Sequence, residues 1–136
     1  MEDLVESFIK KTGVEYYKEM YLTEIESKWG VDLSAISAEG TSTKRWHFVV
    51  KTNNTIYVIE TNFYDGGGSK LNETARSYKM IAEESRQVSG VEFIWITDGG
   101  GWKSARRNLE ETFNIMKHLY NISEMEAGVF EHLFLI

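Results

Sequence analysis

The chain has 136 residues, of which 42% are hydrophobic and 13% aromatic. This composition is sufficient for one hydrophobic core and argues against an intrinsically disordered chain. It contains no cysteine, which excludes disulfide scaffolds, thiol nucleophiles and cysteine-ligated zinc or iron–sulfur sites. With 15 basic and 21 acidic residues the formal net charge is −6. This balance argues against a non-specific nucleic-acid binder. It does not argue against a nucleic-acid enzyme, which needs basic side chains to contact the nucleic acid and acidic side chains elsewhere to bind a metal.

Neither a membrane span nor a secretion signal is visible in the sequence. There is no run of about 18 apolar residues, and the acidic N-terminus lacks a basic stretch followed by an apolar one. We therefore expect a soluble cytoplasmic protein with no membrane partner. No linker or internal repeat divides residues 1–136, which are predicted to form a single domain.

The N-terminal part of the chain carries the helical period. An apolar stripe predicts a helix over residues 2–11, and a second stripe predicts a helix over 15–28 that ends at Gly30. Residues 31–43 are rich in Ser, Ala, Thr and Gly, which is typical of a loop.

The period then changes to that of a β-hairpin. Residues 45–51 (RWHFVVK) and 56–63 (IYVIETNF) are rich in aromatic and β-branched side chains, which favour strands. The asparagine-rich turn 52–55 between them indicates an antiparallel pair.

Helices and strands alternate in the second half. The patterns predict a helix over 70–87, an internal strand over 91–97 and a helix over 103–119. A hairpin followed by a helical crossover predicts an α/β fold with a central mixed β-sheet flanked by helices.

The C-terminal tail is ambiguous. Ser123 and Glu126 have the spacing of a capping box, which predicts a short last helix. Residues 130–136 fit a strand equally well, so the structure of the tail stays open.

Glu60 and Asn62 are the first candidates for chemistry. They share one face at the end of strand 56–63, and Glu60 directly follows four apolar or aromatic residues. Burying an unpaired carboxylate is costly. A hard cation such as Mg²⁺, which takes one or two carboxylates together with water and phosphate, would offset that cost. The competing interpretation is a strand-end glutamate that reaches solvent.

His47 is the partner that the hairpin offers. It lies on strand 45–51, and antiparallel pairing would bring it near Glu60. A lone strand histidine is more often an ordinary core or surface residue. His118 and His132 are distant in sequence and share no metal-ligand spacing with it.

Two glycine triplets precede predicted helices. Gly66–Gly68 and Gly99–Gly101 each place glycine backbone near a helix N-terminus, where phosphates bind favourably. Cationic side chains follow both of them: Lys70, Lys103, Arg106 and Arg107. Neither triplet matches a Walker or dinucleotide-binding loop, so flexible turns explain them as well.

Longer motifs carry a family resemblance. They are KRWHFVV at 44–50, IETNFY at 59–64, GGGSKLNETARSY at 66–78 and FIWITDGGGW at 93–102. Together they resemble the Dpn/Mbo type II restriction endonucleases, which recognise the duplex sequence GATC. The resemblance covers nearly the whole chain, which is similar to the C-terminal catalytic part of those longer enzymes.

The resemblance implies a restriction-endonuclease-like core of the PD-(D/E)xK type. In that core acids on both hairpin strands bind Mg²⁺, and metal ions stabilise charge on the scissile phosphate. Glu60 matches the second acid. Asn62 stands where lysine is usual, in keeping with the E-x-N pattern of this family, and Lys70 is expected to supply the missing cation.

His47 is where the sequence departs from the family, which has aspartate at that position. Neutral imidazole prefers softer transition metals to Mg²⁺. We therefore expect His47 and Glu60 to form a weakened metal site with little or no Mg²⁺-dependent cleavage, and Mn²⁺ as the metal that could still support it. Glu2 or Glu6 on the first helix would be a further acid, and the sequence does not choose between them.

The resemblance also implies duplex DNA as the partner. A palindromic site predicts a homodimer. The residues expected to contact DNA are Lys70, Asn72, Arg76, Lys103, Arg106 and Arg107. An exposed helix face is the competing interpretation for the basic residues. For the whole chain, the alternatives are a non-catalytic DNA-binding module that keeps only the fold, and a fragment that lacks its specificity-determining part.

Overall fold

The computed structural model describes residues 2–36, 44–64, 69–103 and 106–135, with side chains except at 69–70, 102–103, 106–109 and 113. The strands are β1 (Glu15–Tyr21), β2 (Arg45–Lys51), β3 (Ile56–Phe63), β4 (Val91–Asp98) and β5 (Leu119–Tyr120). The helical elements are α1 (Glu2–Thr12), α2 (Leu22–Trp29), α3 (Ser69–Ser85), the 3₁₀ turn η1 (Gly100–Lys103), α4 (Arg106–Ile115), α5 (Ile122–Glu126) and α6 (Val129–Phe134).

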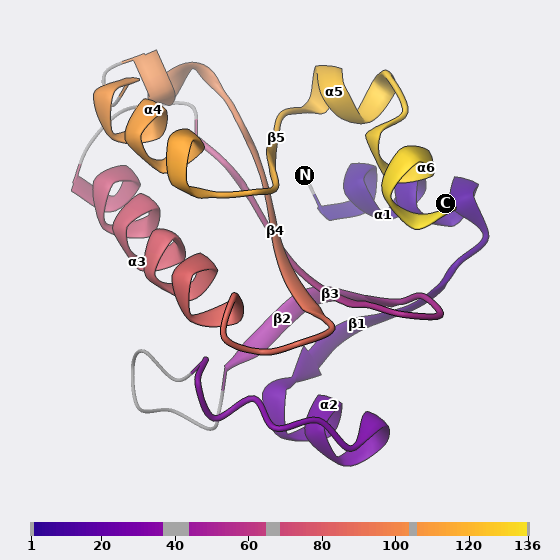
Figure 1. Ribbon diagram of the computed structural model, residues 1–136. Helices are drawn as coiled ribbons and strands as arrows, with labels where there is room; N and C mark the ends of the chain where they lie inside the picture. The colour runs from indigo at the N-terminus through magenta and orange to yellow at the C-terminus, as the bar shows by residue number, and fades with distance from the viewer. Residues whose placement is uncertain (1, 37–43, 65–68, 104–105, 136) are drawn as a thin grey trace.

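The strands form one mixed sheet in the order β1-β2-β3-β4-β5 (Figure 1). β1, β2 and β3 are antiparallel neighbours, whereas β3, β4 and β5 run parallel. Helix α3 makes the crossover from β3 to β4, as parallel pairing requires. The predicted α/β class with a central mixed sheet flanked by helices is confirmed.

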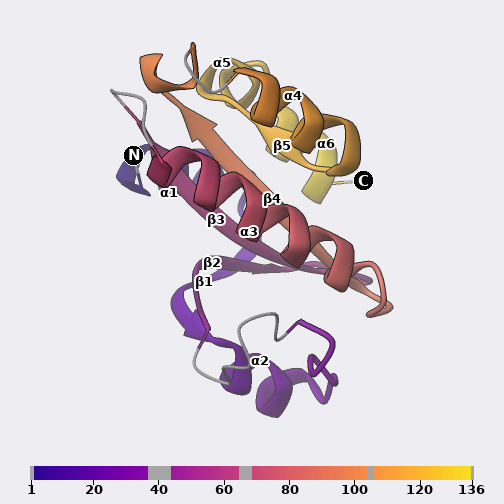
Figure 2. The ribbon, with the colours of Figure 1, turned by 90° about the vertical axis from the view of Figure 1, so that its left-hand side faces the viewer.

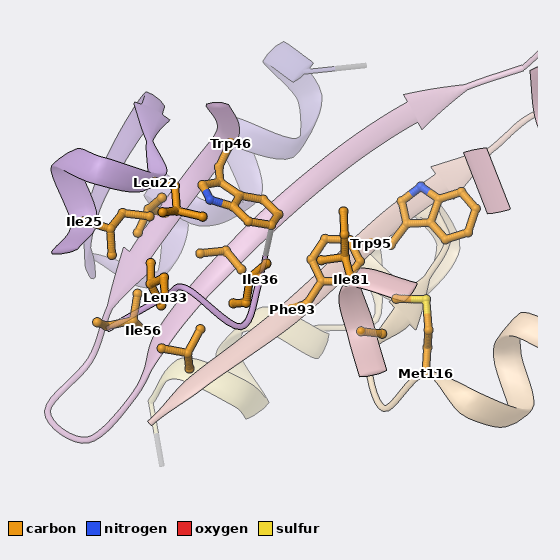
Figure 3. Packing of buried hydrophobic residues seen from close by; sticks show 14 of the residues in the cluster. Leu22, Ile25, Leu33, Ile36, Trp46, Ile56, Ile81, Phe93, Trp95 and Met116 are labelled. Carbon is orange, nitrogen blue, oxygen red and sulfur yellow. The ribbon is translucent and has the colours of Figure 1, made fainter. Parts of the chain in front are cut away.

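Helices cover both faces of the sheet. α3 and α4 lie side by side on one face, and α1, α5 and α6 lie on the other (Figures 1 and 2). Adjacent residues of β3 serve opposite faces: Val58 packs in the core that holds Trp46 and Trp95, whereas Ile59 packs in the second core with Phe48. Figure 3 shows part of the first core, which extends from α2 to the end of α4.

The prediction of one helix over 15–28 is wrong. Glu15–Tyr21 forms β1, which pairs antiparallel with β2, and only Leu22–Trp29 is helical. The segment reads equally well as an aromatic-rich strand, and pairing satisfies the backbone of the β2 edge, which outweighs local helical periodicity. The helix ends at Gly30 as predicted, in the left-handed conformation (φ 65°).

The predicted helix 103–119 is too long. The chain forms η1 and then α4, which ends at Ile115, and residues 104–105 lie outside the described part. Beyond the helix, Trp95 donates its backbone N–H to the carbonyl of His118 at 3.0 Å, which joins Leu119–Tyr120 to the sheet as β5. Sheet pairing thus replaces the last helical turn.

The C-terminal tail is helical. Asn121, not Ser123, caps α5: its Oδ1 accepts the backbone N–H of Glu124 at 2.9 Å, and the Glu124 carboxylate accepts that of Asn121 at 3.1 Å. The strand alternative for 130–136 is wrong for the described residues, because Phe130 and Phe134 lie on α6, one turn apart with stacked rings 4.8 Å between centroids.

The remaining element predictions are confirmed. The helix over 2–11, both hairpin strands, the helix after Gly68 and the internal strand 91–97 are present within a few residues. Residues 37–43 of the predicted loop and the glycine triplet 66–68 lie outside the described part. None of the described helices is long and apolar enough to cross a membrane.

Candidate active site

The candidate site lies where the hairpin strands end. Glu60 follows four buried residues of β3 and is itself only 2% exposed. On β2, Phe48 is paired with Ile59, which places His47 beside Glu60. The proximity predicted from antiparallel pairing is therefore present: His47 Nδ1 lies 3.0 Å from Glu60 Oε2.

Strand β2 departs from regular geometry at this point. Trp46 and Phe48 are two residues apart, yet they pack in the cores on opposite faces of the sheet. Between them, the backbone N–H of His47 donates to the Glu60 carboxylate at 3.3 Å. The side chain of Glu60 thus binds the strand that carries His47.

Both oxygens of the buried Glu60 carboxylate are engaged. Oε2 faces the backbone N–H and the ring of His47, and Oε1 accepts a hydrogen bond from the Lys44 ammonium. A buried carboxylate is tolerated only when it is paired and hydrogen-bonded. Here a lysine from the start of the hairpin supplies the compensating charge.

The ring of His47 connects the hairpin to α1. Its Nδ1 lies 3.0 Å from the backbone nitrogen of Thr61, in hydrogen-bond range. Nε2 lies 3.4 Å from Oε1 of Glu2, a side chain that is 44% exposed. The structure therefore brings Glu2, His47 and Glu60 together in one row.

Glu6, the other acid considered on the first helix, points to a different group. Its carboxylate accepts the Tyr16 hydroxyl at 2.6 Å and lies 3.0 Å from the Lys18 ammonium. The Tyr16 hydrogen bond and the Lys18 contact lower the pKa of Glu6. Of the two candidate acids, Glu2 is the one beside His47.

Asn62 is held by partners from β4 and α3. Its Oδ1 accepts Nε1–H of Trp95 at 2.7 Å, and Trp95 meets the ring of Tyr78 edge-on with 5.0 Å between centroids. Burial raises the pKa of Tyr78 well above its ordinary value of 10.0, and the charge of Glu60 adds to the rise. The amide oxygen of Asn62 is thus committed to the indole.

Sequence reasoning missed Lys44. Its ammonium lies on Glu60 and over two aromatic rings, 4.9 Å from the centroid of Trp46 and 5.7 Å from that of Tyr78. The signal available in the sequence was a lysine directly before a strand that pairs with an acidic one. The contact with α3 depends on tertiary packing and has no local signature.

The described donors do not fit a hard divalent cation as they stand. Glu60 is bound to Lys44, His47 Nδ1 takes the Thr61 amide, and Asn62 Oδ1 takes the Trp95 indole. Within the described ranges, no three His, Asp or Glu side chains form a group able to hold a metal ion. Mg²⁺, which prefers carboxylates and water, lacks its ligand set here.

The residues expected to contact DNA lie on two elements of the other helical layer and on η1. Asn72 and Arg76 are on α3, partly buried and exposed respectively. The side chains of Lys70, Lys103, Arg106 and Arg107 lie outside the described part. Between α3 and α4, Arg76 helps to line a shallow cavity of about 150 Å³.

The second glycine triplet forms a tight connection after β4. Gly101 donates its N–H to Tyr64 O at 2.9 Å, and Asp98 accepts the N–H groups of Gly99 at 2.8 Å and Ile122 at 3.1 Å. A Cβ on Gly99 would lie 2.1 Å from Tyr64 O, so only glycine fits there.

Comparison with known proteins shows which protein family the chain is similar to. The family model described as DpnII restriction endonuclease matches residues 1–132. The type II restriction enzyme DpnII of Streptococcus pneumoniae is 50% identical over 98% of this chain and 48% of its own length. The type II restriction enzyme MboI of Moraxella bovis is 42% identical over 84% of this chain and 38% of its own length. The type II restriction enzyme MjaIII of Methanocaldococcus jannaschii is 33% identical over 98% of this chain and 47% of its own length.

The chain thus spans about half or less of the length of these relatives. No solved structure matches it. The family model covers nearly the whole chain, including the hairpin that carries Glu60. The chain belongs to the DpnII restriction endonuclease family.

Proposed function

We propose that residues 1–136 form the single nuclease domain of a type II restriction endonuclease that hydrolyses phosphodiester bonds of duplex DNA at GATC. The observation that carries this proposal is the buried Glu60 at the end of the hairpin, in a chain whose restriction-enzyme relatives match it over almost its full length. His47, Glu60 and Asn62 are proposed as the catalytic group, with His47 and Glu60 as metal ligands and Lys70 as an added cation.

The proposed DNA face runs along α3, η1 and α4. Support comes from the parallel course of α3 and α4 on one side of the sheet (Figure 2) and from the exposure of Arg76. Phosphate contacts from basic residues would position the duplex, and base-edge contacts would specify it. A palindromic site favours a two-fold homodimer on the DNA.

We propose Mg²⁺ as the metal of this enzyme type, but the present chain is expected to use it poorly. His47 provides no carboxylate, and Glu60 is neutralised by Lys44. Without a metal, Glu60 holds His47 through its backbone N–H and Lys44 through its ammonium. This arrangement specifically favours a second candidate, a DNA-binding module that does not cleave.

Cleavage of a labelled GATC duplex by the chain and by His47→Asp, with Mg²⁺ and with Mn²⁺, tests the proposal. A control duplex carries the same bases in another order. We expect His47→Asp to cleave the GATC duplex with Mg²⁺ at least about 100-fold faster, which matches the loss seen when one charge-stabilising group is removed from an active site. Titration of the same duplex should reach two chains per site.

Each other result has a definite meaning. Equal cleavage by both forms would show that histidine suffices and that the argument about metal preference is wrong. Binding without cleavage by either form would replace the nuclease with the DNA-binding module. If neither form binds or cleaves the GATC duplex, residues 1–136 are not a self-sufficient nuclease domain.

A further inference from the structure

Lys44 is the one cation, among the described residues, in contact with the Glu60 carboxylate. Its side chain is 26% exposed, whereas that of Glu60 is 2% exposed. The Lys44 side chain is therefore the more exposed of the two. Any other cation that binds Oε1 competes with the Lys44 ammonium for this oxygen.

The position of Lys44 is set by more than one contact. Trp46 and Tyr78 present their rings to its ammonium, at 4.9 and 5.7 Å from the two centroids. Cation–π attraction holds an ammonium against an aromatic face most strongly where water is partly excluded. A carboxylate and two rings thus form a small cage around one positive charge.

Two neighbouring donors are already hydrogen-bonded in this arrangement. Asn62 Oδ1 is occupied by the Trp95 indole, and His47 Nδ1 by the Thr61 amide. A divalent cation needs several oxygen ligands and is repelled by a nearby ammonium. A divalent cation that binds Glu60 Oε1 therefore competes with the Lys44 ammonium.

We propose that Lys44 is a tethered cation that occupies the Glu60 carboxylate, so that a divalent cation binds there only by displacing the Lys44 ammonium. This inference rests on the proposed function in that it concerns the same site, and it names the residue that limits cation entry. Lys44 acts through Glu60 and is a positioning residue.

Binding of Mn²⁺ alone, measured without DNA by electron paramagnetic resonance of the free ion, tests the proposal. We expect Lys44→Met to bind Mn²⁺ at least about tenfold more tightly than the chain itself, because the competing charge is removed. Lys44→Arg keeps the charge and should show no gain. Lys18→Met removes a lysine paired with Glu6 at 3.0 Å and is the matched control, also expected to show no gain.

Removing one partner of a buried ion pair also destabilises a fold, so a second variant and a second readout are included. Lys44→Gln is measured beside Lys44→Met, and the thermal midpoint of each is recorded with and without Mn²⁺. Mn²⁺ should raise the midpoint of both variants more than that of the chain itself, since a ligand that binds only the folded state stabilises it. Adding Glu60→Gln to Lys44→Met should abolish the gain.

Folded Lys44 variants that bind Mn²⁺ no more tightly would overturn the inference. So would variants that stay unfolded at saturating Mn²⁺, because the metal then fails to replace the ammonium. The readout does not depend on cleavage. If the Lys44 variants bind Mn²⁺ more tightly but His47→Asp does not cleave DNA, the proposed function is wrong and the inference stands. If His47→Asp cleaves DNA but the Lys44 variants show no gain in Mn²⁺ binding, the inference is wrong and the proposed function stands.

Discussion

His118 shows how a single buried side chain fixes an element. Its Nε2 lies 2.5 Å from the carboxylate of Glu92, and its Nδ1 lies 2.8 Å from the hydroxyl of Tyr120. Burial lowers the pKa of His118 from its ordinary value of 6.5, and the Glu92 contact opposes that shift only in part. The contact with Glu92, at the opposite end of β4 from Asp98, ties the start of β5 to β4.

The lowered pKa of His118 makes stability depend on pH. Above about pH 6.5 the His118 ring is neutral in both the folded and the unfolded chain, so burying it does not lower the free energy of unfolding through protonation. As the pH falls below 6.5, the unfolded chain takes up the proton first, and the free energy of unfolding decreases until the folded pKa is passed.

Urea unfolding at pH 7.5 and pH 5.5 measures this effect. His118→Gln should reduce the loss of stability between the two pH values. His132→Gln, a change at an exposed position, should leave that loss unchanged. An equal pH dependence in His118→Gln and in the unmodified chain would show that other groups carry it.

At the scale of elements, the start of α5 offers a direct test of capping. Asn121 exchanges hydrogen bonds with Glu124, whereas Ser123 is exposed. Asn121→Ala should lower the free energy of unfolding by about 1 kcal/mol, the usual cost of losing an N-cap side chain. Ser123→Ala should change it by less than about 0.5 kcal/mol.

Chemical denaturation of the two alanine variants compares them under identical conditions. Because both replace a small polar side chain at the same turn, the difference between them isolates the cap. A larger loss in Ser123→Ala would restore the capping assignment made from spacing alone.

The elements predicted correctly are those whose signals are local. The hairpin β2–β3 follows from two strand-like runs around a short turn, and that register brings His47 to Glu60. β1 is not predictable from its own residues, because an aromatic amphipathic segment fits both the helical and the strand period, and only pairing with the free edge of β2 decides between them. β5 was missed because two residues carry no period.

The site was predictable to the same extent. Glu60 stands out because a carboxylate follows four buried residues in one strand. The partner of Asn62 is Trp95, and Lys44 reaches Tyr78 on α3, contacts that depend on how β4 and α3 pack. Sequence spacing therefore found the acid and the histidine but not the lysine that neutralises the acid.

At the scale of the whole molecule, the sheet separates two ends with different chemistry. β3 lies between the antiparallel and parallel halves, and its last residues carry Glu60 and Asn62. Glu92 lies near the start of β4, at the opposite end of the sheet from Glu60. There it contacts His118 and Lys117. If the molecule is a nuclease, only the end with Glu60 should matter for cleavage.

Hydrolysis of the GATC duplex by His47→Asp, compared with the same variant carrying either Glu60→Gln or Glu92→Gln, tests this account most directly. Both added changes replace one carboxylate by an amide. The account predicts that Glu60→Gln lowers the cleavage rate at least about 100-fold, the effect expected for a lost charge-stabilising group, while Glu92→Gln leaves it largely unchanged. Cleavage that survives Glu60→Gln would contradict the assignment of the active site to this end of the sheet.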